Sequence, residues 1–183
     1  MGKNIRLFAA IDLPEVVKDQ LAALRTSVPT ARWVGREQMH LTLFFIGETE
    51  RLDAVKDALA GVQAGRFEMA LSGVGRFPPA ERRPPRVLWV GVDAPPALRQ
   101  LQAQVTEALV GSGFSADDRP FSPHITLARL KAERPLAEVN LFLEQQRDFQ
   151  TASFPVEQFT LFSSTLTPQG ARYAAQAVYP LRI

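Results

Sequence analysis

The chain has 183 residues, of which 46% are hydrophobic and 22% are charged, and its formal net charge is +2. This length suits one globular domain, and the small net charge excludes a protein that binds nucleic acid through bulk electrostatics alone. No apolar run approaches the roughly 18 residues of a membrane-spanning helix, so we expect no transmembrane segment. The chain has no cysteine. Disulfides, a thiol nucleophile and a thiolate metal site are therefore excluded, and a cytoplasmic location is favoured.

Hydrophobic periodicity predicts alternating strands and helices in the first half of the chain. The expected elements are a strand over 5–11, a helix from Pro14 to about Ser27, an extended piece over 31–34, a strand over 39–46, a helix over 50–62 and a strand over 67–71.

The second half repeats this alternation. Its expected elements are a strand over 87–92, a helix that Asp93 caps and that reaches residue 109, a strand over 123–130, a helix over 136–146, and strands over 154–162 and 173–181, with a turn at 167–170. The order of elements predicts an α+β fold.

A loop is expected at Arg76–Arg86, because its four prolines exclude both a helix and a central strand. Four arginines make the loop locally basic. Two interpretations stand side by side: a rim that touches a phosphate backbone, or the solvated tip of a hairpin.

Two similar tetrapeptides lie 84 residues apart, His40-Leu41-Thr42-Leu43 and His124-Ile125-Thr126-Leu127. Each begins with one of the chain's only two histidines. On a strand, residues two apart point to the same side, so each motif presents an imidazole beside a hydroxyl. The same alternation predicts Phe44 and Ala128 on the histidine faces and Phe45 on the opposite face. The spacing indicates an internal duplication.

Two imidazoles suit displacement at phosphorus, in which the attacking and leaving oxygens lie on opposite sides. One imidazole can accept a proton from the nucleophile while the other gives a proton to the leaving group. Each threonine hydroxyl can donate to a non-bridging oxygen, where negative charge develops. Alternatives are a structural role for the histidines and a metal site, although zinc usually takes three or four protein ligands. The chain has no Gly-x-Ser-x-Gly elbow and no nucleotide-binding glycine loop.

With these motifs the chain resembles the 2H phosphodiesterase superfamily. It is most similar to the bacterial and archaeal RNA 2′,3′-cyclic phosphodiesterases, also called 2′-5′ RNA ligases. The segments that carry the resemblance are Leu7–Pro14, Trp33-Val34, His40–Glu48, Pro123–Arg129, Phe159–Ser164 and Tyr179–Leu181.

This resemblance implies a single domain over residues 1–183 with an α+β, bilobal fold. Two pseudo-symmetric, intertwined lobes would carry one motif each, at about 40–43 and 124–127. Antiparallel sheets would line a central cleft, with helices outside. The implied activity is metal-independent hydrolysis of RNA 2′,3′-cyclic phosphate ends to 2′-phosphomonoesters, with 2′-5′ RNA ligation as the reverse reaction.

The resemblance also implies the role of each site residue. His40 would give a proton to the departing 3′-oxygen, and His124 would activate water. Thr42 and Thr126 would hold the phosphate, and Arg129 would either contact it or be a surface arginine. We expect a monomer whose partner is RNA or an oligonucleotide, with no metal, no cofactor and no membrane association. The alternative function is a non-catalytic binder of nucleotide phosphates or RNA ends.

Overall fold

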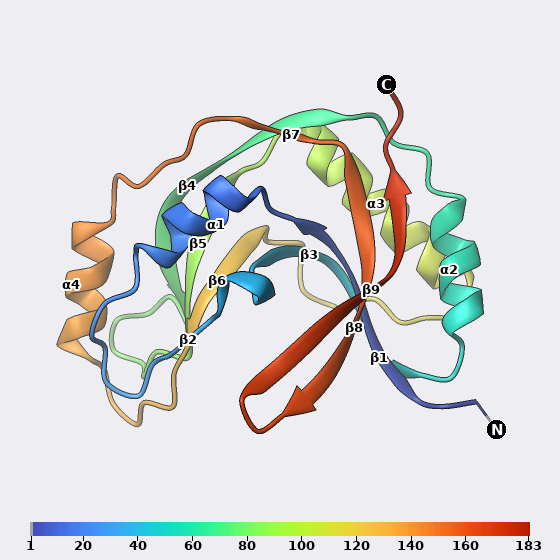
Figure 1. Cartoon of the computed structure of the whole chain (residues 1–183). Helices are drawn as coiled ribbons and strands as arrows, with labels where there is room; N and C mark the ends of the chain where they lie inside the picture. Colours follow the sequence, from blue (N-terminus) through green and yellow to red (C-terminus); the bar gives the residue numbers. More distant parts are fainter. Residues whose placement is uncertain (1) are drawn as a thin grey trace.

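The computed structural model describes residues 2–183, and two antiparallel sheets form its framework (Figure 1). The first sheet has the strand order β3-β1-β8-β9. Its strands are β1 (Ile5–Asp12), β3 (His40–Thr49), β8 (Gln158–Thr167) and β9 (Gly170–Pro180). The predicted turn at 167–170 joins β8 to β9 in a long hairpin that projects from the sheet, shown in red in Figure 1.

The second sheet has the order β2-β6-β5-β4-β7. Its strands are β2 (Arg32–Trp33), β4 (Phe67–Phe77), β5 (Val87–Asp93), β6 (His124–Arg129) and β7 (Phe154–Val156). The first motif therefore lies on the first sheet and the second motif on the second sheet, which confirms the expected α+β architecture with antiparallel sheets.

The helices are α1 (Glu15–Ala22), α2 (Leu52–Ala60), α3 (Pro96–Gly111), α4 (Ala137–Gln145) and the 3₁₀ helix η1 (Arg36–Gln38). Helix α3 shows why they form. Its apolar residues Leu98, Leu101, Val105 and Leu109 recur at helical spacing and are completely buried in the core. Figure 1 shows α2 and α3 side by side at one end of the molecule and α4 at the other. Within residues 2–183, no helix is both long and apolar enough to cross a membrane.

Several predicted boundaries are wrong. Helix α1 ends at Ala22 instead of about Ser27, because the amides of Leu24 and Arg25 bond to carbonyls three residues back. Asp93 ends β5 and does not cap α3, whose N-cap is Pro95.

The predicted strand over 154–162 is two strands, because the chain leaves the second sheet after Val156 and enters the first at Gln158. Strand β4 extends to Phe77, so the first two residues of the expected Arg76–Arg86 loop belong to a strand. The remaining residues connect β4 to β5 as the tip of a hairpin.

Candidate active site

A groove of ≈ 990 Å³ brings the two motifs together. Strand β3 contributes His40 and Thr42 to its lining, and strand β6 contributes His124, Thr126 and Arg129. All five residues singled out from the sequence thus face one space, although they come from different sheets and from sequence positions up to 89 residues apart.

Each motif contains a β-bulge at its fourth residue. In the pairing of β3 with β1, Phe44 and Thr42 have consecutive partners, so Leu43 is the extra residue. In the pairing of β6 with β5, Leu127 is the extra residue in the same way. A bulge reverses the alternation of side chains beyond it, and bulges are common beside active sites.

The bulges correct the predicted faces of the two strands. Phe44 and Ala128 are buried in the core instead of lying beside the histidines. Their successors, Phe45 and Arg129, return to the groove. Strict alternation would have placed Arg129 on the core side, so the bulge at Leu127 is what directs this guanidinium into the groove.

The backbone fixes the same tautomer for both histidines. The Nδ1 atom of His40 lies 2.7 Å from the carbonyl oxygen of Gln38, and the Nδ1 atom of His124 lies 2.8 Å from that of Ser122. A carbonyl can only accept a hydrogen bond, so Nδ1 carries the proton in each ring. Nε2 is therefore the atom that can exchange a proton with a ligand. In His40 it lies 3.0 Å from the Thr42 hydroxyl, which donates to it when the ring is neutral.

Aromatic rings from neighbouring strands hold each imidazole. The His40 ring packs against Phe8, at 4.8 Å between centroids, and edge-on against Tyr173, at 5.3 Å. The His124 ring packs edge-on against Phe77, at 5.1 Å, with Trp89 at 6.4 Å. These contacts restrict the rings, as a site that positions a proton for transfer requires.

Burial lowers the pKa of His40 from 6.5 to about 4. Burial is the largest contribution to this net shift, and the charges of Arg129 and His124 act in the same direction, whereas the Gln38 carbonyl and the Asp12 carboxylate act against it. His40 is therefore neutral at pH 7 while the groove holds no anion.

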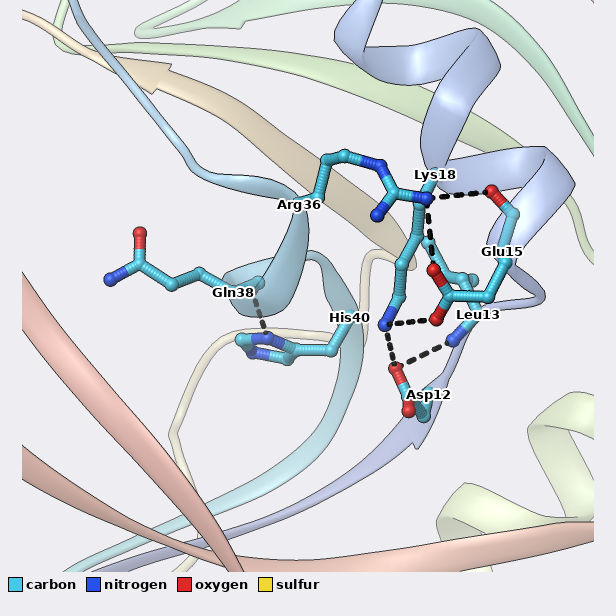
Figure 2. A network of polar contacts seen from close by, with 7 residues as sticks. All are labelled: Asp12, Leu13, Glu15, Lys18, Arg36, Gln38 and His40. Carbon is cyan, nitrogen blue, oxygen red and sulfur yellow. Dashed lines mark hydrogen bonds and ion pairs between the residues drawn. The ribbon is translucent and has the colours of Figure 1, made fainter.

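A polar network lies behind His40, between β1, α1 and η1 (Figure 2). Asp12 is the ladder partner of His40, and its carboxylate binds the buried Lys18 ammonium at 2.9 Å. Arg36 binds Glu15 at 2.9 Å and Asp19 at 2.8 Å, which ties η1 to α1. Because the carbonyl of Gln38 at the end of η1 accepts from His40, this network anchors the hydrogen bond that orients the ring.

Sequence reasoning missed the aromatic rings around each histidine, because strand register decides which rings meet. It also missed the two carbonyls. Both come from the residue two positions before the histidine, a regularity that a comparison of the two motifs could have revealed. Of the segment expected to be the Arg76–Arg86 loop, Phe77 at the end of β4 packs beside His124, whereas the Arg76 side chain is buried and donates to the carbonyls of Pro78 and Arg83.

Residues 2–183 contain no cluster of three or more histidine, cysteine or carboxylate side chains suited to a metal ion. The one histidine pair in the groove thus has no third metal-ligating partner of these types among the described residues.

Comparisons with known proteins agree with this geometry. The chain is 38% identical to the RNA 2′,3′-cyclic phosphodiesterase of Aeropyrum pernix over 86% of this chain and 88% of that protein. It is 37% identical to the protein of the same name from Thermus thermophilus, over 97% of this chain and 91% of the relative.

The crystal structure of Escherichia coli LigT complexed with 3′-AMP is also similar, with a TM-score of 0.78 and 29% identity over 98% of this chain and 99% of that one. A family model described as the 2′-5′ RNA ligase superfamily matches residues 13–167, which include both motifs. The chain therefore belongs to the 2′-5′ RNA ligase superfamily.

Proposed function

We propose that the protein hydrolyses RNA 2′,3′-cyclic phosphate ends to 2′-phosphomonoesters by acid–base catalysis with two histidines. The observation that carries the proposal is the pair of His-x-Thr strands facing one groove, each with its Nε2 atom available for proton transfer. The names of the relatives support the same substrate class.

In the proposed reaction, His124 takes a proton from water as the water oxygen attacks phosphorus. The bond from phosphorus to the 3′-oxygen breaks, and His40 gives its proton to that oxygen. The product carries the phosphate on the 2′-oxygen. The tautomer set by Gln38 and Ser122 gives both histidines the same reactive atom, so their environments must distinguish the acid from the base.

The low pKa of His40 links its charging to substrate binding. A phosphate anion beside the imidazole stabilises the protonated form and also neutralises Arg129, which otherwise lowers this pKa. His40 then takes up its proton when the anion arrives, and becomes a donor only with substrate present.

We propose that Thr42, Thr126 and Arg129 bind the phosphate. The hydroxyls donate to non-bridging oxygens, and the guanidinium forms charge-assisted hydrogen bonds as negative charge develops. Once His40 is protonated it no longer accepts from Thr42, so this hydroxyl is released to the substrate.

The test is incubation with an oligonucleotide that ends in a 2′,3′-cyclic phosphate, with EDTA present throughout, followed by ³¹P NMR of the product. We expect a 2′-phosphomonoester, a rate insensitive to the chelator and a bell-shaped pH profile. A 3′-phosphomonoester would contradict the assignment of the leaving oxygen.

The rival function is binding of RNA ends without turnover, and binding with an unchanged cyclic phosphate would support it. Ligation would use the same groups in the same roles, with a 5′-hydroxyl in place of water as the nucleophile and the 3′-oxygen again as the leaving group. Adding an RNA with a 5′-hydroxyl and probing for a 2′–5′ bond measures that reaction separately.

We further propose that the protein is a monomer and that it acts in the cytoplasm. Sedimentation of the purified protein and fractionation of cells that express it test the two statements.

A further inference from the structure

The groove carries more positive charge than one cyclic phosphate needs. Its lining includes Arg6, Arg32, Arg129 and Arg172, against a single carboxylate residue, Glu37. Arg6 lies over the Phe45 ring, at 5.1 Å from its centroid. Among residues 2–183, the other three form no ion pair and donate no side-chain hydrogen bond. Arginines elsewhere in the chain, such as Arg36 and Arg119, bind carboxylates.

Arg32 lies directly opposite Arg129 in the pairing of β2 with β6. Ladder partners are about 5 Å apart at their Cα atoms, and like charges at such positions repel each other. Within the described part of the chain, neither guanidinium forms an ion pair with a carboxylate. Two facing arginines destabilise the free protein, and a bound anion would relieve their repulsion. The pair is therefore expected at a site that binds an anion.

Arg32 also extends across the groove to the β8–β9 hairpin of the other sheet. Its Nη2 atom is 3.3 Å from the position that a Cβ atom would occupy on Gly170. Gly170 has φ = +115° and begins β9, two residues before Arg172. A side chain at residue 170 would crowd the guanidinium, so the glycine leaves room for Arg32 near Arg172.

We propose that Arg32, with Arg172 on the facing hairpin, binds the phosphodiester group immediately upstream of the terminal nucleotide. The inference rests on the proposed function, in which Arg129 holds the terminal cyclic phosphate. Each phosphate along an RNA strand carries one negative charge, and arginine can bind it in a bidentate manner. The groove therefore favours RNA of two or more nucleotides over a mononucleoside 2′,3′-cyclic phosphate.

The test compares two substrates, a mononucleoside 2′,3′-cyclic phosphate and a dinucleotide that ends in the same group. Wild-type protein is expected to have the higher kcat/KM on the dinucleotide. Arg32→Ala should lower kcat/KM on the dinucleotide by about 10-fold, mainly through KM, and should lower it at least fivefold less on the mononucleotide. For the dinucleotide, the plot of log kcat/KM against log salt concentration has a negative slope. In Arg32→Ala this slope should be shallower by roughly 0.7, as expected for one lost contact to a single strand.

Arg99→Ala is the matched control, because Arg99 is an exposed arginine on α3 that does not line the groove. It should keep the wild-type ratio between the substrates. Arg32→Lys should restore part of the preference, since it keeps the charge but not the bidentate fork.

Equal losses on both substrates in Arg32→Ala would overturn the subsite, and so would no loss on either. A wild-type protein that hydrolyses neither substrate would contradict the proposed function instead. In that case, the subsite is tested by binding. The affinities of the wild-type protein and of Arg32→Ala are compared for a nucleoside 2′-monophosphate and for a dinucleotide with a 2′-phosphate. An effect of Arg32→Ala confined to the dinucleotide would still support it.

Discussion

The two motif strands carry nearly the same four residues in different surroundings. His40 lies against the network of Asp12 and Lys18, and its pKa falls to about 4. Its orienting carbonyl belongs to η1, which Arg36 fixes to α1. The carbonyl that orients His124 belongs to Ser122, an exposed residue in the irregular segment 114–123.

The hydrogen bonds to the threonines differ as well. His40 Nε2 is engaged with Thr42, whereas residues 2–183 contain no equivalent bond between His124 and Thr126. One short motif can therefore supply both an acid and a base, because its environment and not its residues distinguishes the two roles.

The largest expected effect comes from removing either imidazole. His40→Ala and His124→Ala should each lower kcat by about 10²–10⁴-fold, because each removes one proton transfer from the transition state. Circular dichroism controls for folding. The two pH profiles sharpen the comparison, since loss of the acid removes the alkaline limb and loss of the base removes the acidic limb. Near-normal turnover in either variant would refute the two-histidine mechanism.

The threonines come next. Thr42→Val and Thr126→Val keep the shape of the side chain and remove the hydroxyl, and each should lower kcat by about 10²-fold if the hydroxyl contacts the developing charge. NMR titration of His40 distinguishes the two variants, because only Thr42→Val removes a hydrogen bond to His40 Nε2. A His40 titration that changes equally in both variants would contradict this local assignment.

The lowered pKa of His40 makes stability depend on pH. Between pH 6.5 and about 4 the unfolded chain binds a proton at this residue that the folded protein does not, so its contribution to stability is complete above pH 6.5 and is lost as the pH falls. The slope is at most about 1.4 kcal/mol per pH unit. Urea unfolding should show it in the wild-type protein and in His124→Gln, but not in His40→Gln. If the free energy of unfolding of His40→Gln kept the same slope against pH, another titrating group would be its cause.

The smallest expected effect concerns the anchoring of η1. The Gln38 side chain accepts from the Gly35 amide and donates to the carbonyl of Ala171 on β9. Gln38→Ala removes these bonds but keeps the carbonyl that orients His40. We expect kcat to fall about threefold with KM little changed, because the ring is less well positioned. Ser122→Ala is the matched variant, since it also keeps the carbonyl that orients its histidine. An equally large fall in kcat in Ser122→Ala would show that the side chain of Gln38 has no special role in positioning His40.

Local patterns predicted most of the order of elements and the histidine and threonine of each motif that face the groove, because apolar spacing and the His-x-Thr repeat are properties of single segments. They did not predict the bulges at Leu43 and Leu127, which depend on how each strand pairs with its neighbour. For the same reason the sequence did not separate the strand over 154–162 into pieces of two sheets. The low pKa of His40 depends on burial by Phe8 and Tyr173, which lie 32 residues before and 133 residues after it in the chain.

The short connection between the two sheets limits where residues can be inserted into the chain. The Val34 amide donates to the carbonyl of the bulged Leu127, at 2.8 Å, and the chain reaches His40 through η1 shortly afterwards. The residues between Val34 and His40 thus act as a spacer that joins one motif strand to the other. Insertions should be tolerated at the hairpin tip 78–86, whereas one inserted residue in this spacer would change the gap that the phosphate must fill.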